Sequence, residues 1–460
     1  MAKTRSREGA LEALALFALL GLLAAFKMGQ DVDHDLFWQL KDGQRIVVEH
    51  RLPLVEEYSF TAAGAPLPAT EWLAEALTYS IFDATGYGGL LVFNVALFLS
   101  TFALVLALAR RRLPLVESLC LVALLSFAFV NFYGVRAQNW TFLFTTLFLV
   151  LAARWEDGDA KAPWMMAGLL LPWANMHGGF MLGVGILGLF GSYRAWRSRR
   201  WEALAPPALG VLLCCAHPNG FGALSYPIWF MAAPPPGRAL IVEWSPVDFN
   251  SVTAAPYLVV FGLLFWAGLG KKAASPWTAL TVVTAVMAVR GRKLLPEFCL
   301  AAMASLAAGC ASMGAKAARK ILIPVGLACL CALSAVVATN RRSSGLDLER
   351  YFPREAASLL ASNHPGARVF NNYGWGGYLI WKLYPGSRVF IDGRLDPYWD
   401  LLPGDYATII EEKPGWRDLL DRYRVTAALI RPTDRLGEGL SREPAWKLEY
   451  ADQRSVLFTR

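Results

Sequence analysis

Apolar stretches close to the length of a membrane-spanning helix recur along the first three quarters of the chain, separated by short polar segments. A helix needs about 20 mostly apolar residues to cross the hydrocarbon core of a bilayer. The pattern predicts about eleven transmembrane helices, at residues 10–29, 88–109, 113–132, 139–153, 162–176, 179–194, 203–217, 254–270, 275–290, 294–314 and 319–339. The fifth and seventh stretches are short or interrupted by proline, which leaves the number of spans open by about one or two.

The pattern changes after about residue 340, where short apolar runs replace the long ones. Strands are predicted at 367–370, 388–391, 425–430, 446–450 and 455–459, and helices at 349–362, 376–384 and 415–423. Alternating strands and helices favour a parallel or mixed sheet. The expected fold is therefore a polytopic α-helical membrane protein, with a transmembrane domain at 1–340 and a soluble α/β domain at 345–460.

The segment between the first two spans, residues 30–87, is too long to be a simple connection. Its polar and apolar residues alternate with helical spacing at 35–49 and again at 70–82, and a break follows at 83–89. Both helices are amphipathic, with Trp38 and Trp72 suited to head-group depth, so they are expected to lie in the membrane interface.

Composition agrees with a membrane protein, because 55% of the residues are hydrophobic and 17% are charged. Lys and Arg in short loops mark the cytoplasmic side. They gather in the N-terminal tail and in every second connection, at Arg110, Arg111, Arg112, Arg154, Lys161, Arg194, Arg197, Arg199, Arg200, Lys271, Lys272, Lys316, Arg319 and Lys320. We expect a cytoplasmic N-terminus and, after an odd number of spans, an external C-terminal domain. Orientation explains most of the net charge of +8, so nucleic-acid binding is not required.

A few basic residues fall on the predicted outer side, against this bias: Arg136, Arg238, Arg290, Arg292 and Lys293. A phosphate or pyrophosphate head group would favour them there, because a guanidinium matches phosphate oxygens in a fork. We expect Arg290, Arg292 and Lys293, together with Arg136, to bind the phosphate of a lipid carrier. The alternative is that spans nine and ten are misassigned and this basic run is cytoplasmic.

The same outer side collects carboxylates and histidines. The run Asp31-Val32-Asp33-His34-Asp35 directly follows the first span, and Glu71, His177, His217 and Glu243 lie in later outer segments. Ionisable groups at the mouth of a bilayer are costly unless they face water, a cation or a substrate. They are candidate substrate-binding residues for a charged, lipid-linked molecule. The alternatives are a solvated acidic loop and interfacial histidines that make structural hydrogen bonds.

Short motifs punctuate these outer segments: Asp33-His34-Asp35-Leu36-Phe37-Trp38, Pro53 with Tyr58-Ser59-Phe60-Thr61, Glu71-Trp72-Leu73, His177-Gly178-Gly179, His217-Pro218-Asn219-Gly220 and Glu243-Trp244. With this organisation the chain resembles the GT-C glycosyltransferases, and more closely the bacterial multi-spanning proteins assigned to that superfamily. The resemblance implies transfer of a sugar from a polyprenyl-phosphate or -pyrophosphate carrier to a glycan, lipid or protein acceptor. The reaction would take place on the outer face of a bacterial inner membrane.

The resemblance also implies that the catalytic residue is an Asp at the start of the first outer loop, acting as general base towards the acceptor. Asp33 and Asp35 both qualify, and Asp33 is favoured as the first acid of the pair. His34 is expected to be a hydrogen-bonding neighbour of the substrate. An Asp-x-Asp pair also suits a divalent cation such as Mg²⁺ or Mn²⁺, although relatives that use a lipid monophosphate often need no metal.

A second candidate site lies in the C-terminal domain, where a glycine-rich aromatic turn begins at Asn371-Asn372-Tyr373-Gly374-Trp375 and a strand ends at Asp392-Gly393-Arg394. Strand ends of this kind bind ligands in open α/β sheets. The turn resembles the acceptor-reading turn of oligosaccharyltransferase catalytic subunits but lacks its acid, so peptide recognition is not implied. Asn372, Tyr373, Trp375, Asp392 and Arg394 are candidate substrate-binding residues. The alternative is a structural turn.

Two other functions remain open at this stage. A lipid or solute transporter would have as many spans, but it would place ionisable residues near mid-bilayer and often repeat its halves, and neither feature is visible. A non-catalytic membrane partner in glycan or polymer assembly would keep the fold without the chemistry.

Overall fold

The computed structural model describes residues 2–28, 32–129, 132, 134–251, 254–266, 275–340 and 347–460. Two compact units share the chain. The helical unit consists of Met1–Asp31, Leu91–Pro227 and Val242–Ser344, and the mixed unit consists of Val32–Leu90, Ile228–Ile241 and Gly345–Arg460. Asp31 and the linker residues Arg341 and Arg342 lie outside the described residues.

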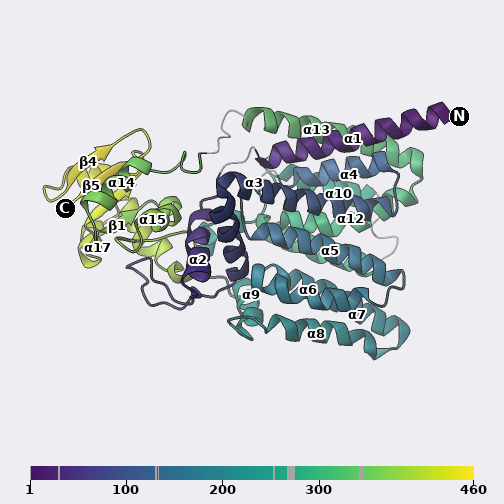
Figure 1. Ribbon diagram of the computed structural model, residues 1–460, viewed down its shortest axis with the longest axis horizontal. Helices are drawn as coiled ribbons and strands as arrows, with labels where there is room; N and C mark the ends of the chain where they lie inside the picture. Colours follow the sequence, from purple (N-terminus) through teal and green to yellow (C-terminus); the bar gives the residue numbers. More distant parts are fainter. Residues whose placement is uncertain are drawn as a thin grey trace. The chain divides into compact units, whose positions relative to one another are not determined.

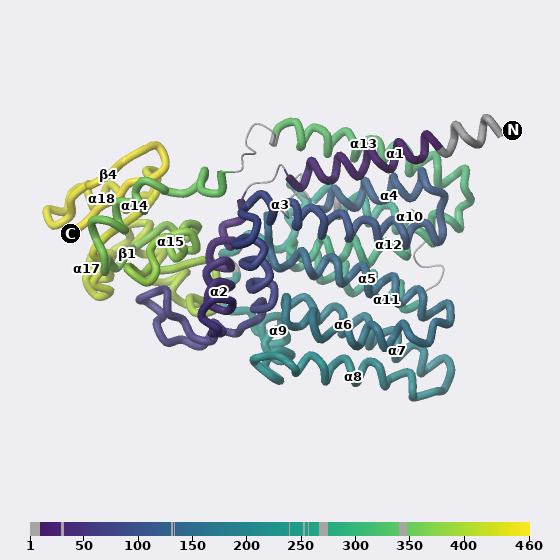
Figure 2. The backbone as a smooth tube through the Cα atoms, in the orientation of Figure 1, coloured from purple at the N-terminus to yellow at the C-terminus, as the bar shows by residue number. Residues whose placement is uncertain are grey.

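The helical unit contains a helix in each of the eleven ranges predicted to span the membrane. They are α1 (Ala2–Met28), the second part of α3 (Trp72–Arg110), α4 (Leu115–Phe127), α5 (Gln138–Glu156), α6 (Ala162–Met176), α7 (Phe180–Ser198), α8 (Ala205–Cys214), α10 (Ala255–Trp266), α11 (Pro276–Arg290), α12 (Leu295–Ser312) and α13 (Ala315–Asn340). A further short helix, α9 (Gly222–Ala232), was not predicted. Figures 1 and 2 show α1 and α13 lying side by side in this unit, where they are in contact.

Four described helices are long and apolar enough by themselves to cross a bilayer: Ala10–Met28, Trp72–Arg110, Arg292–Ser312 and Ala315–Thr339. Of these, the α12 segment is the most enclosed, with 67% of its apolar window buried, against 22% for α1 and for α13. The outer helices leave large apolar side chains such as Phe17 and Leu327 exposed. Because so much exposed apolar surface is unusual for a protein in water, these faces suit contact with lipid. The number of helices that cross the membrane remains a prediction.

The mixed unit is built around a five-stranded sheet in the order β2-β1-β3-β5-β4. Its strands are β1 (Arg368–Asn371), β2 (Arg388–Val389), β3 (Ala427–Ile430), β4 (Lys447–Ala451) and β5 (Val456–Thr459). Strand β1 is parallel to β2 and β3, whereas β5 is antiparallel to β3 and β4. All five predicted strands and the mixed sheet are confirmed. The residues of the central strand β3 are all buried, as its uninterrupted apolar sequence favours.

Several helices accompany this sheet: α14 (Arg354–Asn363), α15 (Gly376–Leu383), α16 (Ala407–Ile410), α17 (Trp416–Arg422) and α18 (Leu436–Ser441). The predicted helices at 349–362, 376–384 and 415–423 correspond to α14, α15 and α17, although α14 begins later than expected. Short turns of helix lie between the strands and helices, at η7 (Tyr373–Trp375), η8 (Asp396–Tyr398) and the π-helix η9 (Leu402–Tyr406). The core of the unit packs Phe370, Phe390, Ile409 and Phe458 together.

The long first loop is part of the mixed unit. Residues 58–60 extend the sheet beyond β2, since Val389 donates to the Tyr58 carbonyl at 3.1 Å and Phe60 donates to the Val389 carbonyl at 3.2 Å. Helix α2 (Leu36–Val48) forms as predicted and packs against α15, where the rings of Phe37 and Tyr378 meet edge to face. Most residues of α2 are buried or half-buried by protein, and its position in the membrane interface remains a prediction.

The second helix of this loop differs from its prediction. Helix α3 starts at Trp72 and runs to Arg110, so that the predicted helix at 70–82 and the second span form one element. Gly86 interrupts it with φ 66° and ψ −172°, which are not helical angles. Such angles are accessible to glycine because it lacks a Cβ atom. The break predicted at 83–89 is therefore present as a kink.

Candidate functional site

The acidic motif lies at the start of α2 in the mixed unit. The Asp33 carboxylate accepts a hydrogen bond from the backbone N–H of Asp35 at 2.9 Å, and the Asp33 carbonyl accepts one from Leu36 at 3.2 Å. These bonds form a turn that leads into the helix. The indole N–H of Trp38 donates to Oδ1 of Asp35 at 3.1 Å. Asp33 is buried, Asp35 is half-buried and His34 is exposed within the chain.

Three glycines of the C-terminal segment lie against this motif. A methyl group on Gly393 would overlap the Asp35 carboxylate, and one on Gly377 would lie 3.0 Å from the His34 carbonyl oxygen. The imidazole of His34 would be 3.7 Å from a methyl group on Gly374 and contacts the ring of Phe352 edge to face. The glycine-rich turn and the acidic motif, predicted as separate sites, are thus parts of one arrangement within the mixed unit.

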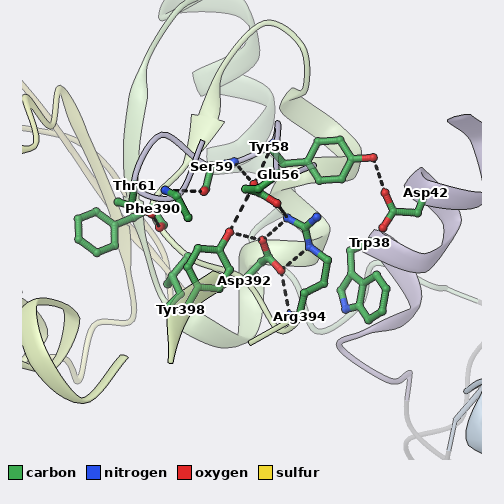
Figure 3. Close-up of polar contacts among 12 residues, drawn as sticks. Trp38, Asp42, Glu56, Tyr58, Ser59, Thr61, Phe390, Asp392, Arg394 and Tyr398 are labelled. Atoms are coloured by element: carbon green, nitrogen blue, oxygen red, sulfur yellow. Dashed lines mark hydrogen bonds and ion pairs between the residues drawn. The ribbon is translucent and has the colours of Figure 1, made fainter. Parts of the chain in front are cut away.

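A buried ionic network, shown in Figure 3, adjoins Gly393. Arg394 forms ion pairs with Asp392 at 2.7 Å and with Glu56 at 2.5 Å, and its guanidinium lies 4.7 Å from the ring centre of Tyr58. The hydroxyl of Tyr398 donates to Asp392 at 2.8 Å. A second bond joins the Tyr58 hydroxyl to Asp42 of α2 at 2.6 Å. The network therefore ties the loop, the helix and the strand end together.

Charge is unevenly balanced in the network, because the buried carboxylates of Asp42, Glu56 and Asp392 share the guanidinium of Arg394, and only Asp42 also gains from the nearby Arg45. Burial raises the pKa of Asp42 and of Glu56, despite the opposing effect of Arg394 on both. Burial also disfavours ionisation of Asp392, but the adjacent Arg394 outweighs it and lowers the pKa of Asp392. The Asp392–Arg394 pair is accordingly the charged centre of the network, and Glu56 and Asp42 hold protons more readily than free carboxyls do.

The predicted ligand-binding residues of the turn mainly hold its shape. Asn372 accepts from the N–H of Gly374 at 3.2 Å and donates to Asp434 at 3.2 Å. The N–H of Tyr373 donates to the hydroxyl of Tyr406, while Trp375 is buried. Asp392 and Arg394 face each other in the network. A role of these five residues in substrate binding remains a prediction. Glu71, also in the mixed unit, accepts from the amide of Gln39 at 3.0 Å.

The helical unit brings together Arg136, Glu243 and Lys293, three residues that are far apart in sequence. Arg136 lies 2.6 Å from Oε1 of Glu243, and Lys293 lies 3.4 Å from Oε2. The ammonium of Lys293 is also 5.2 Å from the ring centre of Trp244. Arg290 is exposed at the end of α11, and the next basic residue, Arg292, donates to the Val242 carbonyl at 2.6 Å. Arg136, Lys293 and Glu243 together form the basic cluster.

His177 belongs to the surroundings of the basic cluster. Its Nδ1 accepts from the N–H of Gly179 at 3.0 Å and lies 2.8 Å from the hydroxyl of Thr141. Burial, together with the positive charges of Lys293 and Arg136, lowers the pKa of His177 to about 3. The imidazole is therefore neutral at pH 7. His217 makes a local turn instead, in which its Nδ1 accepts from Asn219 at 3.0 Å.

Sequence reasoning included Trp38, Tyr58 and Trp244 in its motifs without giving them a role in a site, and it missed Glu56. Trp38 and Trp244 share their motifs with the acids, and this adjacency was the available signal. The partnership of Glu56 with Arg394 joins residues more than 300 positions apart and has no local signal. Searching the described residues finds no group of three or more His, Cys, Asp and Glu side chains that could hold a metal ion. The divalent cation considered for Asp33 and Asp35 remains a prediction.

No family model and no curated protein matches the sequence. Solved structures do match its fold. The archaeal oligosaccharyltransferase AglB from Archaeoglobus fulgidus, in complex with an inhibitory peptide and a dolichol-phosphate, aligns with a TM-score of 0.65 and 9% identity over 92% of this chain and 70% of that chain. ArnT from Cupriavidus metallidurans, bound to undecaprenyl phosphate, aligns with a TM-score of 0.54 and 13% identity over 97% of each chain.

The apo form of ArnT gives the same picture, with a TM-score of 0.55 and 12% identity over 99% of this chain and 98% of that chain. At such low identity these likenesses establish the fold and leave the chemistry to be argued from the residues. Over nearly its whole length, the chain has the fold of the GT-C glycosyltransferases.

Proposed function

We propose that this chain is a membrane glycosyltransferase that moves a sugar from a polyprenyl-phosphate-type carrier to a glycan, lipid or protein acceptor. The observation that carries the proposal is the likeness to ArnT bound to undecaprenyl phosphate, which extends over 97% of both chains. The acidic motif and the basic cluster supply the two kinds of charge that such a reaction needs. The orientation inferred from loop charges puts the reaction on the outer face of a bacterial inner membrane.

Asp33 is the proposed general base, because an acceptor hydroxyl or amine must lose a proton as it attacks the sugar. Asp35 is the proposed orienting acid, with its carboxylate held by the Trp38 indole. The Asp33 carboxylate is held by the N–H of Asp35 at 2.9 Å, and the Asp35 carboxylate lies against Gly393. A fixed base avoids the cost of reorganisation at the moment of reaction.

Arg136 and Lys293 are the proposed binding residues for the carrier phosphate. When the bond between the sugar and the phosphate breaks, negative charge develops on the bridging oxygen. Fixed cations stabilise that charge more in the transition state than in the ground state. His177 is neutral and hydrogen-bonded, so it is a donor or acceptor for a ligand and adds no charge to the cluster.

The test begins by deleting the gene and identifying the lipid-linked glycan that accumulates or the glycan that loses a sugar. Asp33→Asn and Asp35→Asn are then introduced, with Asp418→Asn on the exposed surface of the mixed unit as the control. Loss of a positioned base lowers the rate by about 10²–10⁴-fold. If the double variant, at normal abundance, restores the glycan as fully as the control, the chain is not the catalyst and acts as a partner in assembly.

A further inference from the structure

Glu243 divides its two carboxylate oxygens between two cations of the basic cluster. Oε1 lies 2.6 Å from Arg136 and Oε2 lies 3.4 Å from Lys293. The side chains of both cations are less than one fifth exposed, and that of Glu243 is 34% exposed. An anion thus already lies between the two groups proposed to bind the carrier phosphate.

This anion is permanent under physiological conditions. Burial opposes ionisation of Glu243, but Lys293 and Arg136 outweigh burial and lower its pKa to about 2. The neighbouring His177 is neutral at pH 7. With Glu243 ionised, the two cations and the carboxylate carry a single net positive charge.

The backbone around Glu243 is also hydrogen-bonded to the end of α11 and to the short helical turn Arg292–Leu294 that precedes α12. Arg292 donates from its side chain to the Val242 carbonyl at 2.6 Å and from its backbone to the Ser245 carbonyl at 3.1 Å. Val247 donates to the Val289 carbonyl at 3.1 Å. These bonds on both sides of Glu243 hold its segment against the element that carries Lys293.

We infer that Glu243 is a specificity-determining residue for the donor, because its carboxylate selectively weakens the attraction of the basic cluster for charge beyond that of a single phosphate. This inference rests on the proposed function and deepens it by naming the class of carrier. A sugar joined through one phosphate is a phosphodiester with one negative charge, whereas a sugar joined through a pyrophosphate carries two. The additional charge is attracted by Arg136 and Lys293 but repelled by the carboxylate of Glu243, so Glu243 removes part of the advantage that a pyrophosphate would otherwise have. One elementary charge at about 6 Å in such a site changes affinity by roughly tenfold.

The experiment compares two lipids that differ by one phosphate. Full-length protein in nanodiscs is titrated by calorimetry with farnesyl methyl phosphate and with farnesyl methyl diphosphate at constant ionic strength. The wild type, Glu243→Gln and Glu202→Gln are measured, the last being an exposed acid of the helical unit that serves as the control. Arg290 and Arg292 are unchanged in all three proteins, so the difference between variants isolates the charge of Glu243.

Relative to the wild type and Glu202→Gln, Glu243→Gln should shift the ratio of the two affinities about tenfold in favour of the diphosphate. An unchanged ratio in Glu243→Gln overturns the inference and leaves the proposed function standing. So does an equal loss of both lipids, because the carboxylate would then only hold the cations in place. Binding of neither lipid by the wild type counts against the proposed function itself. Glu243→Ala is measured in the same way, so that the comparison does not depend on the folding of Glu243→Gln.

Discussion

Trp38 makes the clearest single contact to a proposed catalytic carboxylate. Its indole N–H donates to Asp35 at 3.1 Å, and phenylalanine would keep the apolar ring but lose this donor. We expect Trp38→Phe to lower the transfer rate about tenfold, since hydrogen bonds to charged groups contribute about 1.5–3 kcal/mol. Glycan restoration in cells and thermal unfolding of the purified protein are measured together. A parallel loss of rate and stability would mean that Trp38 acts only through packing.

Gly393 lies against the same carboxylate, so a substitution at Gly393 tests whether the position of Asp35 matters for transfer. A methyl group there would overlap Asp35, so Gly393→Ala must displace either the carboxylate or the strand end. We expect a loss of transfer of about 10²-fold, as displacements near 1 Å are costly in positioned reactions. Gly88→Ala, where a methyl group meets nothing within 4 Å, is the matched control. Full activity of Gly393→Ala would show that Asp35 need not be held there.

The buried pair of Asp392 and Arg394 gives a prediction about pH. Because the folded-state pKa of Asp392 is lowered, its contribution is present above the pKa of the unfolded chain and is lost as pH falls through the folded-state value. Asp392→Asn should cost about 3–5 kcal/mol at neutral pH and progressively less below about pH 4. Thermal unfolding between pH 3 and 7 checks this. A constant difference between variant and wild type would contradict it.

The residues of the candidate sites could be predicted only in part from the sequence. Outer-face acids and bases could be proposed from the bias of loop charges, and the structure brings Arg136, Glu243 and Lys293 together. Which acid meets which cation could not be proposed, because a linear pattern of charges carries no information on pairing across more than 100 residues. The contact of His34 and Asp35 with glycines of the C-terminal segment could not be predicted for the same reason.

At the scale of elements, periodicity located most strands and helices, because burial imposes a period of two on strands and of 3.6 on helices. It does not reveal tertiary contacts, so the packing of α2 on α15 could not be predicted from the amphipathic pattern. The break before the second span was located, and Gly86 forms it within α3. Helix α18 has only six residues, too few for a period to be recognised, and α9 is interrupted by Pro227.

The kink in α3 is expected to depend on Gly86. At φ 66° and ψ −172° an L-residue is strained, so Gly86→Ala should lower the free energy of unfolding by about 1–3 kcal/mol or straighten the helix. Gly88→Ala in the same helix lacks this conformation and should leave stability within about 1 kcal/mol. Denaturation of both variants in the same detergent makes the comparison. Equal stabilities of the two variants would mean that the free energy of unfolding does not depend on the conformation at Gly86.

At the scale of the whole molecule, the distribution of Lys and Arg predicts opposite sides for the two ends of the chain. Alkaline phosphatase fused after Arg460 should be active, because this enzyme needs the external compartment, and a fusion in the basic loop after Arg200 should be inactive. A reporter that reads in the cytoplasm is the matched partner for both positions. Inactive phosphatase at Arg460 would reverse the orientation and remove the outer-face reaction with it.

The mixed unit is assembled from three separated stretches of chain, and this has a consequence for biosynthesis. Asp33 and Asp35 are translated more than 340 residues before Gly377 and Gly393, the glycines that lie against the acidic motif. Contacts between such distant positions form late and slowly, because a long loop must close before they contribute. A nascent or truncated chain therefore carries the acids of the motif without their support. The ribosome must translate well past Gly393 before the motif is complete, which delays any chemistry at the acids until late in synthesis.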